Sequence, residues 1–165
     1  MNQTHRFENH QFIIDDYDKQ KPFASFLPGM AGARGIPLWS FYVNRGQGIS
    51  SFGLRDKNGA ILEFYPANLA YLYVSKIGFR TFLKVNGQFK ECFLPEDNVS
   101  KKTMMISQSE FTLLEIDPKL NLETKVTYFG LPNESFAALV RKVDITNRSK
   151  KAQTLELLDG ISQLL

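Results

Sequence analysis

The fold class follows most directly from residues 79–93, which read FRTFLKVNGQFKECF. Residues 79, 81, 83 and 85 share one face of an extended strand, as period-two alternation requires. Asn86-Gly87 then supplies a two-residue turn that tolerates positive φ. The chain returns through residues 88–93, with Phe89 and Phe93 expected on one face. The segment therefore predicts an antiparallel β-hairpin.

The same kind of pattern recurs before and after this hairpin. Residues 52–55 and 60–64 flank Asn58-Gly59 and predict a second hairpin. Residues 110–116 and 120–131 predict a third, in which Pro118 belongs to the turn because it has no N–H to donate to a ladder.

Two further strands are predicted near the end of the chain. Residues 135–146 form a long alternating run in which Ala137, Leu139, Val143 and Ile145 share a face, and Arg141 is the exception. A polar turn at residues 147–151, with three exposed basic side chains, leads to a strand at residues 154–158. Helical periodicity is almost absent. Strands, turns and no helices predict an all-β fold, an antiparallel two-sheet β-sandwich.

Composition narrows the functional classes. The chain has 165 residues, which suits one domain, and a net charge of +3 that is too mild to indicate a nucleic-acid partner. It shows no export signal and no apolar run that would span a membrane. A single cysteine, Cys92, excludes an internal disulfide and fits a cytoplasmic protein with a small buried thiol. His5 and His10 are expected in solvent, so no metal site is predicted.

Residues 21–48 interrupt the alternation. This stretch combines three prolines and five glycines with the aromatic residues Phe23, Phe26, Trp39, Phe41 and Tyr42. It predicts a long irregular loop, and function concentrates in such loops.

Two segments resemble a known family. The first runs from DDYDKQKPF at 15–23 through FLPGMAG at 26–32 and GIPLWSFYVNRGQ at 35–47 to ILEFYPAN at 61–68. The second combines RKVDITNRS at 141–149 with LELLDG at 155–160. Together they are similar to the N-terminal β-sandwich of glycoside phosphorylases in glycoside hydrolase family 94, the branch acting on 1,2-β-oligoglucans above all, with cellobiose phosphorylases more distant.

The resemblance implies a supersandwich of the galactose-mutarotase-like kind. In the family a linker and an (α/α)6 barrel follow it, and the barrel carries the general-acid Asp. Inorganic phosphate is the co-substrate, α-glucose 1-phosphate is the product, and the sandwich supports a homodimer. Because residues 154–165 are largely apolar, residues 1–165 are expected to be one N-terminal domain, or most of one, truncated from a longer chain. No catalytic residue is assigned, and the parent's catalytic barrel is the expected partner.

Six side chains are candidates for contact with a β-glucan or oligosaccharide. Sugars present C–H faces that stack on aromatic rings and hydroxyls that need planar donors and acceptors. The candidates are Trp39, Tyr42, Asn44, Arg45, Gln47 and Asn68. A core strand at residues 39–43 and a turn at residues 44–47 are the structural alternatives. The carboxylates Asp15, Asp16 and Asp18 are expected to form a solvated acidic stretch and not an acid–base pair.

Three functions therefore remain open. The first is a non-catalytic domain of a phosphorylase that cleaves β-glucosides with phosphate, with no cofactor. The second is a stand-alone carbohydrate-binding module. The third is an assembly domain whose aromatic region is an interface. Neither a nucleic acid nor a membrane is an expected partner.

Overall fold

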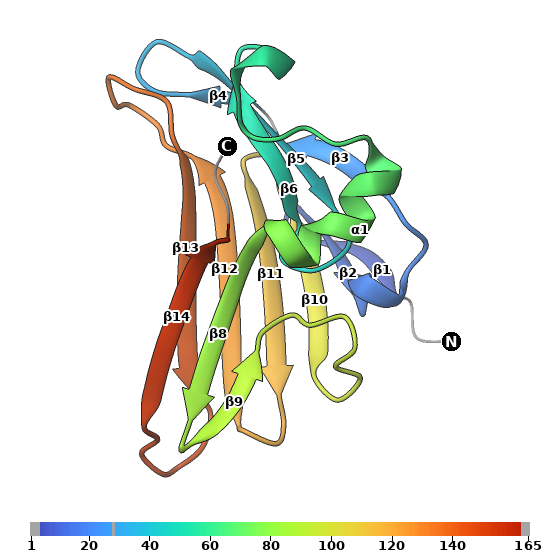
Figure 1. Ribbon diagram of the computed structural model, residues 1–165, viewed down its shortest axis with the longest axis vertical. Helices are drawn as coiled ribbons and strands as arrows, with labels where there is room; N and C mark the ends of the chain where they lie inside the picture. Colours follow the sequence, from blue (N-terminus) through green and yellow to red (C-terminus); the bar gives the residue numbers. More distant parts are fainter. Residues whose placement is uncertain (1–3, 28, 163–165) are drawn as a thin grey trace.

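The computed structural model describes residues 4–27 and 29–162 and arranges their strands in two layers (Figure 1). One layer is a six-stranded sheet in the order β1-β2-β10-β11-β12-β13. Every neighbouring pair in it is antiparallel. Its strands are β1 (His5–Glu8), β2 (Gln11–Asp15), β10 (Lys101–Ile106), β11 (Glu110–Asp117), β12 (Leu122–Gly130) and β13 (Leu139–Asn147).

The second layer contains two smaller sheets. One has the order β14-β8-β9, and the other has the order β3-β5-β6-β7 with β4 also paired to β5. The strands are β3 (Ala24–Leu27), β4 (Met30–Ala31), β5 (Ile36–Val43), β6 (Ile49–Leu54), β7 (Ala60–Leu62), β8 (Phe79–Val85), β9 (Gln88–Glu91) and β14 (Leu155–Ile161). Short 3-10 turns occur at Tyr17–Lys19 and Lys57–Gly59. The predicted all-β antiparallel sandwich is confirmed, with its second layer divided in two.

An aromatic row crosses the core and joins both small sheets to the large one. The ring of Tyr42 on β5 lies 4.6 Å from Phe111 on β11, measured between centroids. Phe111 lies 5.8 Å from Tyr128 on β12, which in turn lies 5.6 Å from Phe79 on β8. Such tilted ring pairs contribute about 0.5–1.5 kcal/mol each beyond their buried area.

The hairpin predicted at residues 79–93 is confirmed in its strands and its turn. β8 pairs with β9, and Asn86 and Gly87 both have positive φ. The side chains of Thr81, Leu83 and Val85 are buried on one face, as predicted. The prediction that Phe89 and Phe93 share a face is wrong. β9 ends at Glu91 and Phe93 has a φ of 60°, so the side chain of Phe93 is buried in the core while that of Phe89 is exposed.

The other predicted pairings are also present. β6 pairs with β7, and β11 pairs with β12, as predicted. The connection between β6 and β7 that contains Asn58-Gly59 is a 3-10 turn. β13 begins at Leu139 and not at residue 135. Asn133 takes a left-handed conformation, and the N–H of Leu131 donates to the carbonyl of Ala138, so residues 132–138 form a closed loop.

The prediction of a long irregular loop at residues 21–48 is wrong. Three strands, β3, β4 and β5, lie within it. Pro37 pairs with Met30 at the edge of the short β4 strand, where a residue without an N–H is tolerated. The glycines occupy the turns between these strands and do not interrupt them.

A helix that was not predicted, α1 (Ala67–Ile77), covers part of the outer face of β5 and β6 (Figure 1). Its buried residues Ala70 and Val74 pack against Phe41 and Val43. The spacing of Ala67, Ala70, Tyr71, Val74 and Ile77 carries the helical period. One Asn, one Ser and four aromatic or β-branched residues weaken the helix propensity of the segment.

At Gly48 the backbone lies directly against the aromatic row. It has a φ of +80°, and a Cβ placed there would lie 2.3 Å from Cε1 of Phe111. Gly87 has a similar φ of +85°, but nothing lies within 4 Å of its Cβ position. The two glycines therefore separate the effect of backbone conformation from the effect of packing.

We predict that Gly48→Ala lowers the free energy of unfolding by about 3 kcal/mol, because left-handed strain and overpacking add. Gly87→Ala is expected to cost about 1 kcal/mol, since only the strain applies. Urea denaturation followed by circular dichroism measures both values. Equal losses for the two variants would contradict the close packing of Gly48 on Phe111.

Candidate functional site

Four aromatic side chains form a cluster over the outer face of β5. They are Phe26, Trp39, Phe41 and Phe64, and the cluster is called here the aromatic patch. Trp39 and Phe41 are two residues apart on β5 and share its outer face. Phe26 comes from β3 through the register pair with Phe41, and their ring centroids are 4.9 Å apart. Phe64 follows β7 and lies 5.3 Å from Phe41 and 5.8 Å from Trp39.

The aromatic patch has a buried base and an exposed rim. Phe41 is buried, whereas Phe26 and Phe64 are 50% and 36% exposed. The rings of Phe26 and Phe64 lie within 15° of parallel. Rings of this orientation at a surface offer flat apolar area to a ligand, and contiguous exposed apolar area often marks an interaction site.

Trp39 is held in place on two sides. Its indole N–H donates to the carbonyl oxygen of Asp56 at 3.0 Å. A Cβ at Gly53 would lie 2.7 Å from Cζ2 of the indole, so the ring lies against bare backbone there. The indole is therefore pre-positioned beside the exposed polar turn at residues 55–58.

Three of the predicted sugar contacts lie inside the fold. Tyr42 is on the opposite face of β5 from Trp39 and belongs to the aromatic row. Asn44 is fully buried, accepts from the N–H of Phe23 and donates to the carbonyls of Tyr17 and Lys21. These hydrogen bonds fix the chain that leads into β3, so the amide of Asn44 is occupied.

Gln47, the third buried candidate, belongs to a polar network between the layers. Its Nε2 donates to Thr81 Oγ1 at 3.0 Å, and its Oε1 accepts from Arg141 at 2.5 Å. Arg141 also donates to Thr81, to the Tyr128 hydroxyl and to Asp159. Arg141, the charged residue in the apolar pattern of β13, is therefore buried, and its guanidinium donates hydrogen bonds to partners within the fold.

Arg45 and Asn68 lie apart from the patch. The guanidinium of Arg45 donates to the carbonyls of Asn44 and Gln20 and lies 6.0 Å from the ring centroid of Tyr71. Asn68 is exposed on the first turn of α1. The six candidates therefore do not converge on one surface, and their sugar contacts stay predictions. Phe26 and Phe64 were not among them, because only the pairing of β3, β5 and β7 brings them together.

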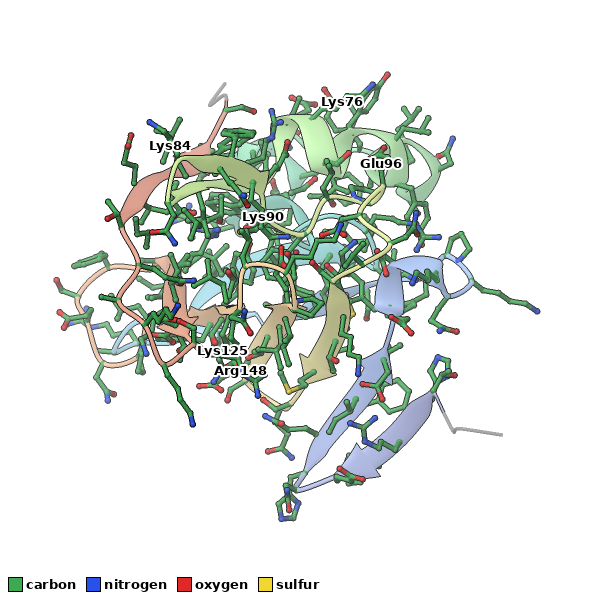
Figure 2. All side chains as sticks on the ribbon, turned by 90° about the horizontal axis from the view of Figure 1, so that it is seen from below. Lys76, Lys84, Lys90, Glu96, Lys125 and Arg148 are labelled. Carbon is green, nitrogen blue, oxygen red and sulfur yellow. The ribbon has the colours of Figure 1, made fainter. Side chains whose placement is uncertain are left out.

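A second charged network surrounds the buried ammonium groups of Lys90, which is labelled in Figure 2, and of Lys102. Lys90 Nζ contacts Glu115 at 2.5 Å, Asp117 at 2.9 Å and Asp97 at 3.0 Å. Both ammonium groups are paired, so this network serves to join β9, β10 and β11.

This network corrects the prediction that Asp15, Asp16 and Asp18 form a solvated acidic stretch. Asp18 was expected in solvent, but its side chain is 5% exposed and pairs with Lys102 at 2.7 Å. Asp15, in turn, pairs with Arg6. Cys92 is buried as predicted, and burial, followed by the charge of Glu115, raises the pKa of its thiol to about 12.

No metal or membrane feature is found in the part of the chain that the structure describes. Among residues 4–27 and 29–162, no three His, Cys, Asp or Glu side chains form a group that could hold a metal ion. No helix within these residues is long and apolar enough to cross a membrane. The exposed positions of His5 and His10 agree with the sequence analysis.

Comparison with known proteins adds no relative. No protein-family model matches the chain, and no curated protein sequence matches it. The resemblance to the phosphorylase sandwich therefore remains a prediction based on the residues that carry it.

We predict that Asp97 makes the fold acid-sensitive. Burial favours its neutral form, but donors from Ser100, Val99 and Lys90 outweigh this and hold its pKa below the ordinary value. A carboxylate with a lowered folded-state pKa contributes stability above its unfolded-state pKa and loses it as the pH falls. The stability difference between the natural chain and Asp97→Asn is therefore expected to be constant above about pH 5 and to shrink steadily as the pH falls below it.

Urea denaturation of both proteins across this pH range measures the difference. A constant difference would mean that Asp97 does not stabilise the fold through its charge.

Proposed function

We propose that this chain is a non-catalytic β-sandwich domain of a cytoplasmic glycoside phosphorylase similar to those of family 94, and that it contacts β-glucan through the aromatic patch. The sequence resemblance at residues 15–68 and 141–160 supports the family. The two-layer antiparallel fold is compatible with the sandwich that the resemblance implies. A buried free thiol at Cys92 is compatible with a reducing compartment.

The exposed aromatic patch is the observation that carries the sugar-binding part of the proposal. Trp39 is fixed by its hydrogen bond to Asp56, so little conformational freedom is lost when a ligand stacks on it. Phe26 and Phe64 extend the apolar area beside it. The exposed turn at residues 55–58 supplies a carboxylate, an amide and two cationic side chains within the same region for sugar hydroxyls.

The chemistry of the parent enzyme belongs to its catalytic barrel in this proposal. Inorganic phosphate would attack the β-glucoside there and release α-glucose 1-phosphate with inversion. The sandwich would hold the glucan near the barrel and support a homodimer. A second candidate, an independent carbohydrate-binding module, is favoured by the same patch and differs in needing no barrel for affinity.

We predict that Trp39→Ala weakens binding of 1,2-β-glucooligosaccharides by about tenfold, which corresponds to about 1.4 kcal/mol and is the upper range of one aromatic contact. Isothermal titration calorimetry on the 165-residue chain measures this. Phe89→Ala is the matched control, since Phe89 is a 71% exposed aromatic residue on β9, outside the patch.

Equal loss in both variants, or no binding by the natural chain, would contradict a sugar site at the patch. Binding by the isolated chain as tight as by a chain fused to a barrel would favour the independent module.

A further inference from the structure

Arg55 occupies the centre of a strained turn that follows β6, beside the aromatic patch. The N–H of Asp56 donates to the carbonyl of Leu54 at 2.8 Å, and Arg55 between them has a φ of 64°. A hydrogen bond that spans two residues around a positive φ defines the classic γ-turn, which is rare and strained. A side chain at the centre adds to the strain, because its Cβ crowds the following carbonyl group.

The chain contains a second turn of the same kind, and its central residue is a glycine. The N–H of Ile49 donates to the carbonyl of Gln47 at 3.0 Å, and Gly48 between them has a φ of 80°. Glycine has no Cβ and reaches positive φ without the steric cost. Arg55 therefore carries a strain that Gly48 avoids in the same type of turn.

Arg55 also differs from the other non-glycine residues with positive φ in the described chain. Most of these belong to the types that tolerate the left-handed region best, and they are Asn9, His10, Asp16, Asn86, Asn121 and Asn133. In Phe93 the strain is offset, because the ring is buried in the core and the N–H donates to the carboxylate of Glu115. The side chain of Arg55 is exposed, and it has no hydrogen-bond or ion-pair partner among residues 4–27 and 29–162.

The surrounding backbone holds the γ-turn from two sides. The N–H of Arg55 donates to the carbonyl of Pro37 at 3.0 Å. A Cβ placed at Gly59 would lie 2.1 Å from the carbonyl oxygen of Leu54, so the 3-10 turn lies directly against the γ-turn. A strained residue persists only where its surroundings over-determine it, and such residues cluster at ligand-contacting sites.

The same turn holds the indole of Trp39. The residue after Arg55 is Asp56, whose carbonyl accepts the indole N–H at 3.0 Å. The Oδ1 of Asp56 accepts from the N–H of Asn58 at 2.8 Å, so this carboxylate is engaged within the loop. The guanidinium of Arg55 is the polar group of the γ-turn that is left for a ligand on the indole.

We propose that Arg55 is a specificity-determining residue of the aromatic patch, and that its guanidinium donates two hydrogen bonds to adjacent hydroxyls of the sugar unit stacked on Trp39. A guanidinium presents its donors as a rigid planar fork, which suits two acceptors lying side by side. Trp39 supplies the apolar contact, and Arg55 fixes the orientation of the sugar ring. This inference rests on the sugar contact proposed for the patch and names its polar determinant.

Arg55→Gly separates the cost of the arginine to the fold from its use in binding. Urea denaturation of the 165-residue chain is expected to show a higher midpoint for the variant. The reason is that the relief of left-handed strain exceeds the conformational entropy that a glycine adds to the unfolded chain. Isothermal titration calorimetry with 1,2-β-glucooligosaccharides is expected to show binding weakened about fivefold, as for the loss of a net hydrogen bond.

Two further variants serve as comparisons. Arg55→Lys keeps the positive charge and the strain but lacks the fork, so it is expected to unfold at the natural midpoint and to bind more weakly than the natural chain. Asn121→Gly is the backbone control, because Asn121 is exposed, has a φ of 52° and lies between β11 and β12 in the other layer. It is expected to leave glucan binding unchanged.

The outcomes distinguish this inference from the proposed function. A lower urea midpoint for Arg55→Gly would mean that the arginine stabilises the fold, and it would overturn the inference. Full binding by Arg55→Gly or by Arg55→Lys would also overturn it, while weakened binding by Trp39→Ala in the same experiment would leave the patch proposal standing. A natural chain that binds no glucan would overturn both.

Discussion

The aromatic row from Tyr42 through Phe111 and Tyr128 to Phe79 is the contact on which the two-layer arrangement depends. The six-stranded sheet presents an inner face that neither small sheet pairs with by backbone hydrogen bonds. The row links both small sheets to it through side chains, and Gly48 leaves the space that the ring of Phe111 fills. Together with other buried side chains of the same core cluster, such as Leu83, Leu113 and Val126, the row keeps the apolar inner faces away from water. This burial is the main driving force that holds the two layers together.

The polar groups of the interior are committed to structure. Arg141 holds partners from several segments, and Lys90 pairs with two carboxylates of β11 and with Asp97 in the loop after β9. Removing one partner would leave a buried charge less well compensated. The described fold also leaves apolar side chains exposed, among them those of the aromatic patch and those of Phe89 and Leu158 on the sheet formed by β14, β8 and β9. The function of this chain is therefore better sought in binding surfaces than in these interior side chains.

Local patterns predicted the strands and their turns, because alternation and Asn86-Gly87 act over a few residues. They did not predict features that depend on distant partners. The helix α1 is stabilised by packing on Phe41 and Val43, and the face of Trp39 depends on which side of β5 meets Phe111. Arg141 was visible as an exception in an apolar pattern, but its partners come from four separate segments.

The proposal of a sugar-contacting surface can be tested at one atom. Trp39 is the single tryptophan of the chain, so its indole N–H gives one resonance in a ¹H–¹⁵N correlation spectrum. Titration with 1,2-β-glucooligosaccharides should shift this resonance saturably, together with the amides of residues 55–58, and leave those of β14 in place. An indole resonance that stays unmoved while other regions shift, or a spectrum that does not change, would contradict the assignment of the aromatic patch.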